Sequence, residues 1–432
     1  MSSADVLLLN AILYTITMLW VVNKNKFSVG VMIWALYTVS AWSSFLFVQQ
    51  PLYFSSGHFS EQTIMPCIYL YCVLVIAISP LMKLKTIEVF DFSYNRKILR
   101  MIFIVCTLIQ FVFFIVDIPS MFRVMTAGTS NLSVLRSTLY ENEGNTYVIH
   151  NVWLNRVSLL YSGMRILATG FSIIAFLTYK HDRKLVNAFA ISALLNNIRI
   201  IVTSVGRGEM VLTFMLYACV IWLLKDRLDK KLRRTVLVYG VPIVAVGAIF
   251  FWAITISRFG DNAAYFMYKY LGEPINNFNG ILFTHTKGAT MGRAYFSLIY
   301  HYIFGEAAFT SAYDKWDLIK SVTGVRGDIF YTWVGGLVIE FGKIVPVVVA
   351  IIINRMITRL VRVKKYYAGD ILVLIFFINF FVRGIFIFPT QSFEGNLMIV
   401  YTILLYFCFR IRKNDLGSLV YLRPKSKFRN GR

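Results

Sequence analysis

Ile371-Leu-Val-Leu-Ile-Phe-Phe-Ile-Asn-Phe-Phe-Val382 is the stretch of this chain that decides its fold, because Asn379 is its single polar residue. The run from Ile102 to Val116 is almost as unbroken. Strands of a transmembrane β-barrel would instead alternate apolar and polar residues over about 10 positions. A backbone group left unpaired in hydrocarbon costs several kcal/mol, and a helix pairs its own groups. These runs therefore predict membrane-spanning helices.

The composition extends this prediction to the whole chain. The 432 residues are 58% hydrophobic and 15% charged, with a mean hydropathy of +0.65, whereas a soluble chain has about 45–50% apolar and about 25% charged residues. Apolar runs of about 17–25 residues predict an all-α, polytopic transmembrane helix bundle with about 11 spans. The runs are 5–22, 27–48, 66–82, 100–119, 156–179, 185–202, 208–224, 235–255, 332–354, 371–389 and 395–409.

Lys and Arg in the connections predict the orientation, since cytoplasmic connections carry an excess of both. If the basic connection 24–26 is cytoplasmic, 29 of the 44 basic residues and seven of the 21 acidic residues lie on that side. The N-terminus is then periplasmic, and a basic cytoplasmic tail, 413–432, follows a membrane domain, 1–412. Because topology accounts for nearly all of the +23 net charge, we expect membrane lipid and no nucleic acid as a partner of the basic face.

Two connections on the predicted outer side, 120–155 and 257–331, are far longer than the about two to eight residues that most helix connections need. The second is a large periplasmic loop between spans 8 and 9. Within it, the apolar and aromatic stretch from Ala294 to Phe304 predicts a helix lying in the membrane interface.

Arginine predominates among the basic residues outside the cytoplasmic connections. Its planar fork of donors grips phosphate bidentately and keeps its charge, so this bias predicts an anionic, phosphate-bearing substrate. The ten arginines among these 15 basic residues are Arg123, Arg136, Arg156, Arg165, Arg199, Arg207, Arg258, Arg293, Arg326 and Arg383.

Arg165, Arg199 and Arg383 lie inside predicted spans, where a charge costs about 2.5–3.5 kcal/mol at the helix centre. We expect them to face a wet cavity or a partner. The structural alternatives are a pair between Arg383 and Glu394 across the last helical hairpin, and snorkelling of Arg165 and Arg199 to the outer headgroups.

Ser204-Val-Gly-Arg207-Gly-Glu209 lies at an outer break between two spans. The amides that open the following helix would point outward beside Arg207, which is typical of an anion site. A tight turn between two helices is the alternative interpretation.

The outer side offers many groups for proton transfer, but no spacing typical of a metal site or a catalytic triad, so we expect no metal and no cofactor. These groups are His150, His285, His301, Glu209, Asp261, Glu273, Glu306, Asp314 and Asp328.

Three segments resemble motifs of the Wzy-type O-antigen and capsule polymerases. Thr203-Ser-Val-Gly-Arg207-Gly-Glu209 is similar to the Ser-Arg-Gly turn of that family. The stretch from Tyr268 to Asn279 resembles its tyrosine-rich segment after a loop arginine, here Arg258. Tyr331 to Gly342, with an acid at Glu340, resembles the Gly-rich helix after its large loop. The likeness covers roughly residues 196–356, and its motifs are diffuse.

The resemblance implies an enzyme of the bacterial inner membrane that joins undecaprenyl-diphosphate-linked oligosaccharide repeat units on the periplasmic face. The growing glycan would pass from its lipid diphosphate to a sugar hydroxyl of the incoming unit, with a polysaccharide chain-length regulator as a further partner. The expected catalytic residues are Arg207, Arg258, His301 and Glu273, the expected diphosphate contacts are Arg199, Arg293 and Arg326, and the expected sugar contacts are Tyr265, Tyr270 and Tyr313.

Two alternatives stay open. A flippase for lipid-linked oligosaccharides would carry basic residues through both halves of its bundle and show internal repeats, whereas the intramembrane arginines here fall in the predicted outer half. A ligase that moves a finished glycan to a lipid acceptor would share most of these residues.

Overall fold

The structure is a computed structural model. It describes residues 1–55, 61–84, 86–87, 89–91, 96–126, 152–179, 182–203, 207–228, 260–305, 309, 312–363, 365–409, 411–413 and 420–422, with isolated positions between 230 and 256. The predicted run 235–255, the connection 120–155 beyond Thr126, and most of the tail 413–432 therefore lie outside the described residues.

The described chain is mostly helical. Its elements are α1(Ser3–Asn25), α2(Val29–Val48), α3(Pro51–Ser55), α4(Ile64–Met82), β1(Val89–Asp91), α5(Arg96–Thr126), α7(Val152–Thr178), α8(Arg183–Thr203), α9(Arg207–Leu223), η1(Lys225–Arg227), η2(Gly260–Asn262), α11(Ala263–Asn277), the π-helix η3(Phe278–Phe283), α12(Ser297–Phe304), α13(Ala312–Thr323), α14(Thr332–Phe341), α15(Val345–Val361), β2(Lys365–Tyr367), α16(Ala368–Arg383), α17(Phe393–Cys408), β3(Ile411–Lys413) and β4(Val420–Leu422). Among the described residues, only the parallel pair β1–β2 and the antiparallel pair β3–β4 form β-strands.

Six of the described helices are long and apolar enough to cross a membrane: α1, α2, α4, α5, α7 and α8. The shorter helices α9, α14 and α17 are also apolar. The predicted class of an all-α membrane helix bundle is confirmed at this level.

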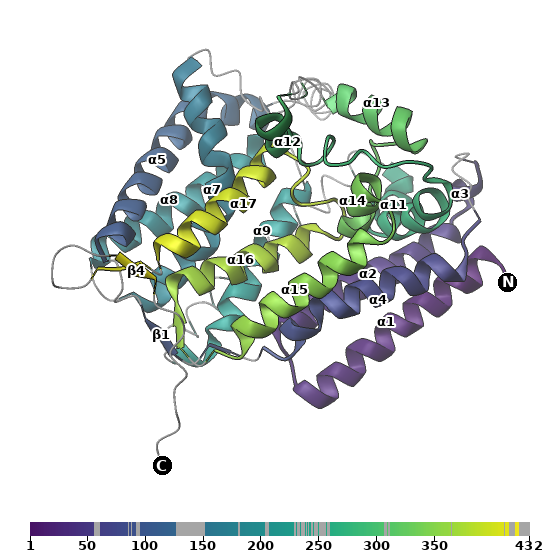
Figure 1. The fold of residues 1–432 in the computed structure, drawn as a ribbon, viewed down its shortest axis with the longest axis horizontal. Helices are drawn as coiled ribbons and strands as arrows, with labels where there is room; N and C mark the ends of the chain where they lie inside the picture. The colour runs from purple at the N-terminus through teal and green to yellow at the C-terminus, as the bar shows by residue number, and fades with distance from the viewer. Residues whose placement is uncertain are drawn as a thin grey trace.

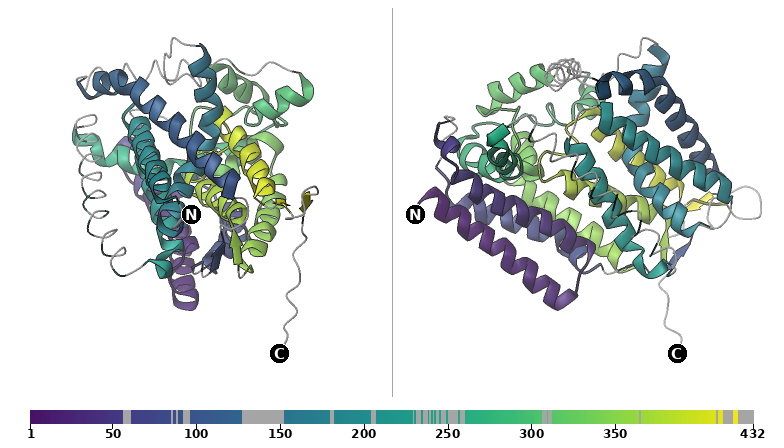
Figure 2. Two further views of the ribbon diagram at one scale, coloured as in Figure 1. Left: turned by 90° about the vertical axis from the view of Figure 1, so that its left-hand side faces the viewer. Right: turned by 180° about the vertical axis from the view of Figure 1, so that it is seen from behind.

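α16 joins two groups of helices. One group is α1, α2, α4 and α15, and the other is α5, α7, α8 and α17, while α9 and α16 lie between them (Figure 1). The views from the side and from behind in Figure 2 show the same two groups. Nearly every residue of α16 is buried, as expected for a helix that is apolar all round.

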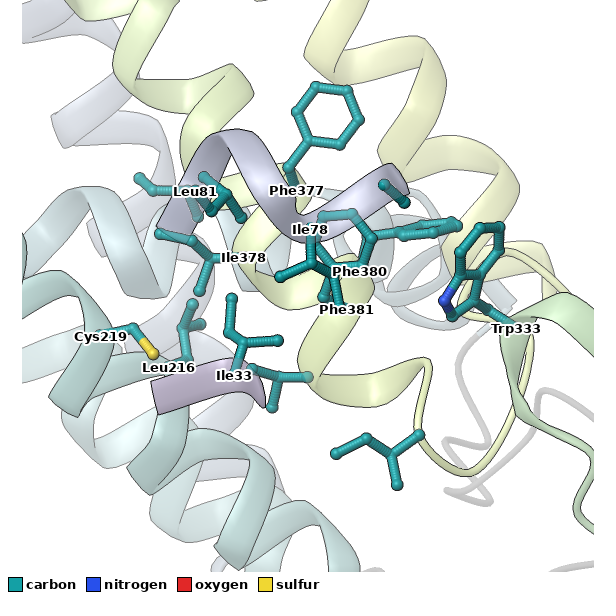
Figure 3. Close-up of a cluster of buried hydrophobic side chains, with 14 of the residues drawn as sticks. Ile33, Ile78, Leu81, Leu216, Cys219, Trp333, Phe377, Ile378, Phe380 and Phe381 are labelled. Carbon is teal, nitrogen blue, oxygen red and sulfur yellow. The ribbon is translucent and has the colours of Figure 1, made fainter. Parts of the chain in front are cut away.

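The core fills the space where the two groups meet. Side chains from α2, α4, α9 and α16 converge there with Trp333 of α14 (Figure 3). Ile33, Ile78, Cys219 and Phe381 are all fully buried in this cluster.

The connections predicted to be cytoplasmic lie together at one end of the bundle. In the connection after α4, the Ile87 N–H donates to the Leu223 carbonyl at the end of α9 (2.9 Å). β1 in the same connection pairs in parallel with β2, between α15 and α16. Arg100 of α5 and Asp182, which precedes α8, are 3.8 Å apart. Four basic connections thus share one end, as the charge pattern predicts.

The prediction of one helix over 332–354 is wrong. α14 ends at Phe341, and α15 begins at Val345, after a turn in which Gly342 has a φ of 78°. Glycine favours this left-handed conformation, and Pro346 in the first turn of α15 suits a helix start. The two helices form a hairpin.

The hairpin places α14 inside the bundle and its turn at the surface. The Trp333 N–H donates to the Gly384 carbonyl just after α16 (2.7 Å). At the other end, the Tyr69 hydroxyl near the start of α4 donates to the Lys343 carbonyl. Lys343 and Ile344 are exposed, whereas residues 332–340 are buried.

The segment predicted as a large outer loop, 257–331, is built mainly of helices. α11 packs along α2, where the Ser40 hydroxyl donates to the Leu271 carbonyl (2.7 Å) and Ser44 hydrogen-bonds Asn276. α12, inside the predicted interfacial stretch, contacts α17, and α13 lies beside it at the same end of the molecule (Figure 1).

A cysteine at Lys343 tests the helical hairpin. In a single span over 332–354 this position would lie at the middle of the bilayer, whereas the hairpin brings it to the surface. In a chain whose five native cysteines are replaced, Lys343→Cys should react with a membrane-impermeant maleimide. Ile351→Cys, on the exposed apolar face of α15, is the control and should stay unlabelled. Protection of both positions would contradict the hairpin.

Gly272 tests the packing of α11 on α2. A methyl group there would lie 2.5 Å from the Ser44 backbone nitrogen, so Gly272→Ala should lower the free energy of unfolding by about 1–3 kcal/mol. Thermal unfolding in detergent measures the loss. At Gly240 a methyl group would meet no atom within 4 Å, so Gly240→Ala is the matched control; equal losses would argue against the close approach.

Candidate functional site

Two arginines and two glutamates from four helices form a charged cluster inside the bundle. Arg165 of α7 donates to one oxygen of Glu394 of α17, from Nη2 at 2.6 Å and from Nε at 3.2 Å. Arg383 of α16 donates from Nη2 to Oε2 of Glu209 of α9 at 2.6 Å. That same Glu209 oxygen lies 3.7 Å from Nη1 of Arg165. Glu209 therefore links the two arginines.

The arginines of this cluster are more deeply placed than the glutamates. The side chains of Arg165 and Arg383 are 8% and 13% exposed, whereas those of Glu209 and Glu394 are 24% and 27% exposed. Two guanidinium ions in such a place need compensating charge, because removing one partner of a buried pair costs about 3–5 kcal/mol. With two carboxylates the formal charge of the cluster is balanced.

A small cavity adjoins the arginines. Its volume is about 10 Å³, close to the space that one water molecule occupies. Arg165, Thr169, Asn197, Thr213, Asn379 and Arg383 supply its polar lining. Thr169 donates to Asn197 (3.3 Å), which in turn donates to the Tyr217 hydroxyl (2.7 Å). Polar groups from α7, α8, α9 and α16 thus continue the charged cluster into the bundle.

α11 covers the first turn of α9. A methyl group on Gly208 would lie 2.6 Å from the Tyr270 hydroxyl, so the glycine permits this approach. The Tyr270 ring packs against Phe330 (5.7 Å between centroids) and Phe386 (5.0 Å). Gly208 is therefore next to the tyrosine-rich segment, while residues 204–206 of the predicted turn lie outside the described residues.

A second charged group, formed by Arg326, Asp328 and Glu273, lies near the tyrosine-rich segment. Arg326 holds Asp328 through two hydrogen bonds of 2.9 and 2.5 Å, and this keeps the pKa of the Asp328 carboxyl below its usual range. Burial raises the pKa of Glu273, which accepts from Asn277 (3.1 Å) and feels the charges of Arg326 and Asp328. The nearby Tyr331 hydroxyl is buried and has no hydrogen-bond partner within the described part of the chain.

Glu340 positions the segment before α12. Its buried carboxylate accepts from the Thr290 hydroxyl (2.7 Å), the Gly292 N–H (2.6 Å) and the Tyr295 N–H. This acid, singled out by the resemblance, therefore fixes the chain that leads to His301 in α12.

The structure brings some of the expected site residues together. Tyr270, Glu273 and Arg326 gather near the start of α9, whose first residue is Arg207. The side chain of Arg207 and the whole of Arg258 lie outside the described residues.

Other expected residues lie elsewhere. Arg199 is paired with Asp117 of α5 at 2.7 Å, and both side chains are buried. Tyr265 is buried against Phe47, so its ring faces are covered.

Three further expected residues lie nearer the surface. Arg293 is exposed, Tyr313 is exposed on α13 with its ring beside Trp316, and His301 is half-buried in α12.

The partners of the intramembrane arginines differ from the alternatives weighed for them. Arg383 pairs with Glu209 and not with Glu394, because Glu394 accepts from Arg165. Arg165 and Arg199 are buried in ion pairs, so they do not snorkel to the headgroups.

No three His, Cys, Asp or Glu side chains of the described residues are grouped as a metal site would require. No protein-family model, curated protein or solved structure matches the chain.

A double-mutant cycle tests the Arg165–Glu394 pair. Arg165→Met and Glu394→Gln should each lower the free energy of unfolding, and their coupling should exceed about 1 kcal/mol because the guanidinium is buried. The exposed pair of Arg100 and Asp182, 63% and 44% exposed, is the control cycle, with a coupling of about 0–1 kcal/mol. Chemical unfolding in detergent gives both coupling energies. A coupling energy near zero for Arg165 and Glu394 would show that this pair does not stabilise the fold.

Proposed function

We propose that this chain polymerises undecaprenyl-diphosphate-linked oligosaccharide repeat units on the periplasmic face of the bacterial inner membrane. It transfers the growing glycan from its lipid diphosphate to a sugar hydroxyl of the incoming unit. The end of the bundle where β1 and β2 pair is cytoplasmic in this proposal. The N-terminus is then periplasmic and the C-terminus cytoplasmic.

The observation that carries the proposal is the pair of guanidiniums beside the start of α9, that of the buried Arg165 and that of the partly buried Arg383. The amides that open a helix attract anions, so this helix start and the two forks suit a phosphate-bearing group. α11 and the segment 326–331 cover this region and supply further polar side chains.

The chemistry requires a site for a departing diphosphate. As the glycosidic carbon leaves its phosphate oxygen, negative charge develops on that oxygen. Fixed donors in a partly dehydrated site stabilise this charge, each by about 2.7–4 kcal/mol. Before substrate binds, Arg165 and Arg383 are positioned by carboxylates from other helices.

The acceptor hydroxyl needs at most one base. Glu273 is our candidate, because burial raises its pKa toward the range in which a carboxylate is an effective base. Tyr270 lies on the same side and offers a contact to sugar. A chain-length regulator would act on this end of the protein.

The placement of buried charge favours the polymerase over a flippase. Asp117, Arg165, Arg199 and Arg383 all belong to the half of the bundle away from β1 and β2. Among the described buried charges, Asp370 lies at the other end, where it accepts from the Tyr367 N–H to cap α16. A continuous basic path through both halves would favour transport instead.

Arg383 tests the proposal in cells that lack their own copy of the gene. Arg383→Gln should leave single repeat units and abolish the ladder of long chains, while the protein level stays unchanged. Arg123→Gln, at the exposed end of α5, is the matched control and should keep the ladder. Electrophoresis of the surface glycan reads the result, and a normal ladder from Arg383→Gln would refute the proposal. Repeat units trapped in the cytoplasm after gene deletion would indicate a flippase.

A further inference from the structure

We propose that Glu209 and Glu394 occupy, in the resting protein, the places that the two negative charges of the substrate diphosphate take. This inference rests on the proposed function and names a device at the same site. The carboxylates neutralise the arginines while no substrate is bound. The lipid-linked diphosphate must displace them to reach the arginines.

The first argument is the order of the groups in depth. The arginine side chains are about one-tenth exposed, whereas the glutamate side chains are about one-quarter exposed. The carboxylates therefore lie on the more accessible side of the guanidiniums. An anion that approaches from the surface meets Glu209 and Glu394 before it meets Arg165 or Arg383.

The second argument is the charge balance. A diphosphate that carries a sugar on one phosphate and a lipid on the other has two negative charges. It would replace two carboxylate charges, so two buried guanidiniums stay compensated before and after the exchange. A lipid-linked monophosphate has one negative charge and would leave one guanidinium without its counter-charge, which is costly for a buried ion.

The third argument is that the displaced carboxylates have a favourable place to go. Glu209 and Glu394 lie in the first turns of α9 and α17, where the helix dipole stabilises a negative charge. Both are already partly exposed, so a change of rotamer brings each carboxylate to water. The exchange moves no charge into hydrocarbon.

The exchange involves all four helices of the cluster. The Arg165–Glu394 bond joins α7 to α17, and the Arg383–Glu209 bond joins α16 to α9. A ligand that replaces both carboxylates must bridge both arginines, which lie 3.7 and 2.6 Å from the same Glu209 oxygen. A ligand with two linked phosphates can replace both carboxylates, one phosphate at the place of Glu394 and the other at the place of Glu209.

Binding to the purified full-length protein in detergent tests the inference. The probe is farnesyl-diphosphate-linked N-acetylglucosamine, and the comparison probe is the same sugar on farnesyl monophosphate. Isothermal titration calorimetry should show that Glu394→Gln binds the diphosphate probe about ten-fold more tightly than the unaltered chain, because one competing charge is gone. The exposed Asp317 of α13 supplies the control, since Asp317→Asn should leave binding unchanged.

The outcomes separate the inference from the proposed function. If Glu394→Gln binds the diphosphate probe no more tightly than the unaltered chain, while Arg165→Gln loses binding, the carboxylates do not compete with the substrate. The inference is then overturned, and the proposed diphosphate site still holds. Unchanged binding by Arg165→Gln and Arg383→Gln would overturn the site itself. If Glu394→Gln does not fold, Glu394→Asp keeps the charge but shortens the reach, and it should also bind more tightly. Equal affinity for the two probes would overturn the charge-matching argument.

Discussion

The need to compensate two guanidiniums inside a helix bundle constrains this structure more than any other interaction. Arg165 and Arg383 come from α7 and α16, and each depends on a carboxylate from a different helix. The four helices α7, α9, α16 and α17 must therefore keep a common register at one end. The same requirement leaves a small cavity between them and places the start of α9 beside the charges. The apolar packing around α16 and the ion pairs at its C-terminal end therefore involve the same helices.

Much of the fold is readable from local hydrophobicity, and its main error has a physical cause. Apolar runs identify where helices form, since hydrocarbon demands internally paired backbones. Run length alone missed the break after α14, although Gly342 and Pro346 are stop and start signals for helices. Apolar residues interspersed with charges predict a loop over 257–331. Its tyrosines and phenylalanines in fact pack α11 against α2, and η3 against α4 and α14.

Buried charge is predictable here from residue type, but its pairing is not, and neither Arg165 nor Arg383 is among the catalytic or substrate-binding residues expected from the sequence. Arginine within predicted spans indicated buried charge, and Arg165 and Arg383 do form the cluster. Their partners, Glu394 and Glu209, are 229 and 174 residues away along the chain, and no local pattern encodes contacts at that separation. The close approach of Tyr270 gives Gly208 a steric reason, whereas residues 204–206 of the predicted Gly-Arg-Gly turn lie outside the described residues.

The parallel pairing of β1 with β2 has a consequence for biosynthesis. Val89 pairs with Lys365 and Asp91 with Tyr367, so β1, in the connection after α4, completes its backbone pairing only when the chain has been made as far as residue 367 of 432. α16 then enters between helices that are already in the membrane. Contacts so distant in sequence form slowly. A chain that ends before residue 365 therefore lacks the strand that pairs with β1, and the backbone groups of β1 stay unpaired at that end of the bundle.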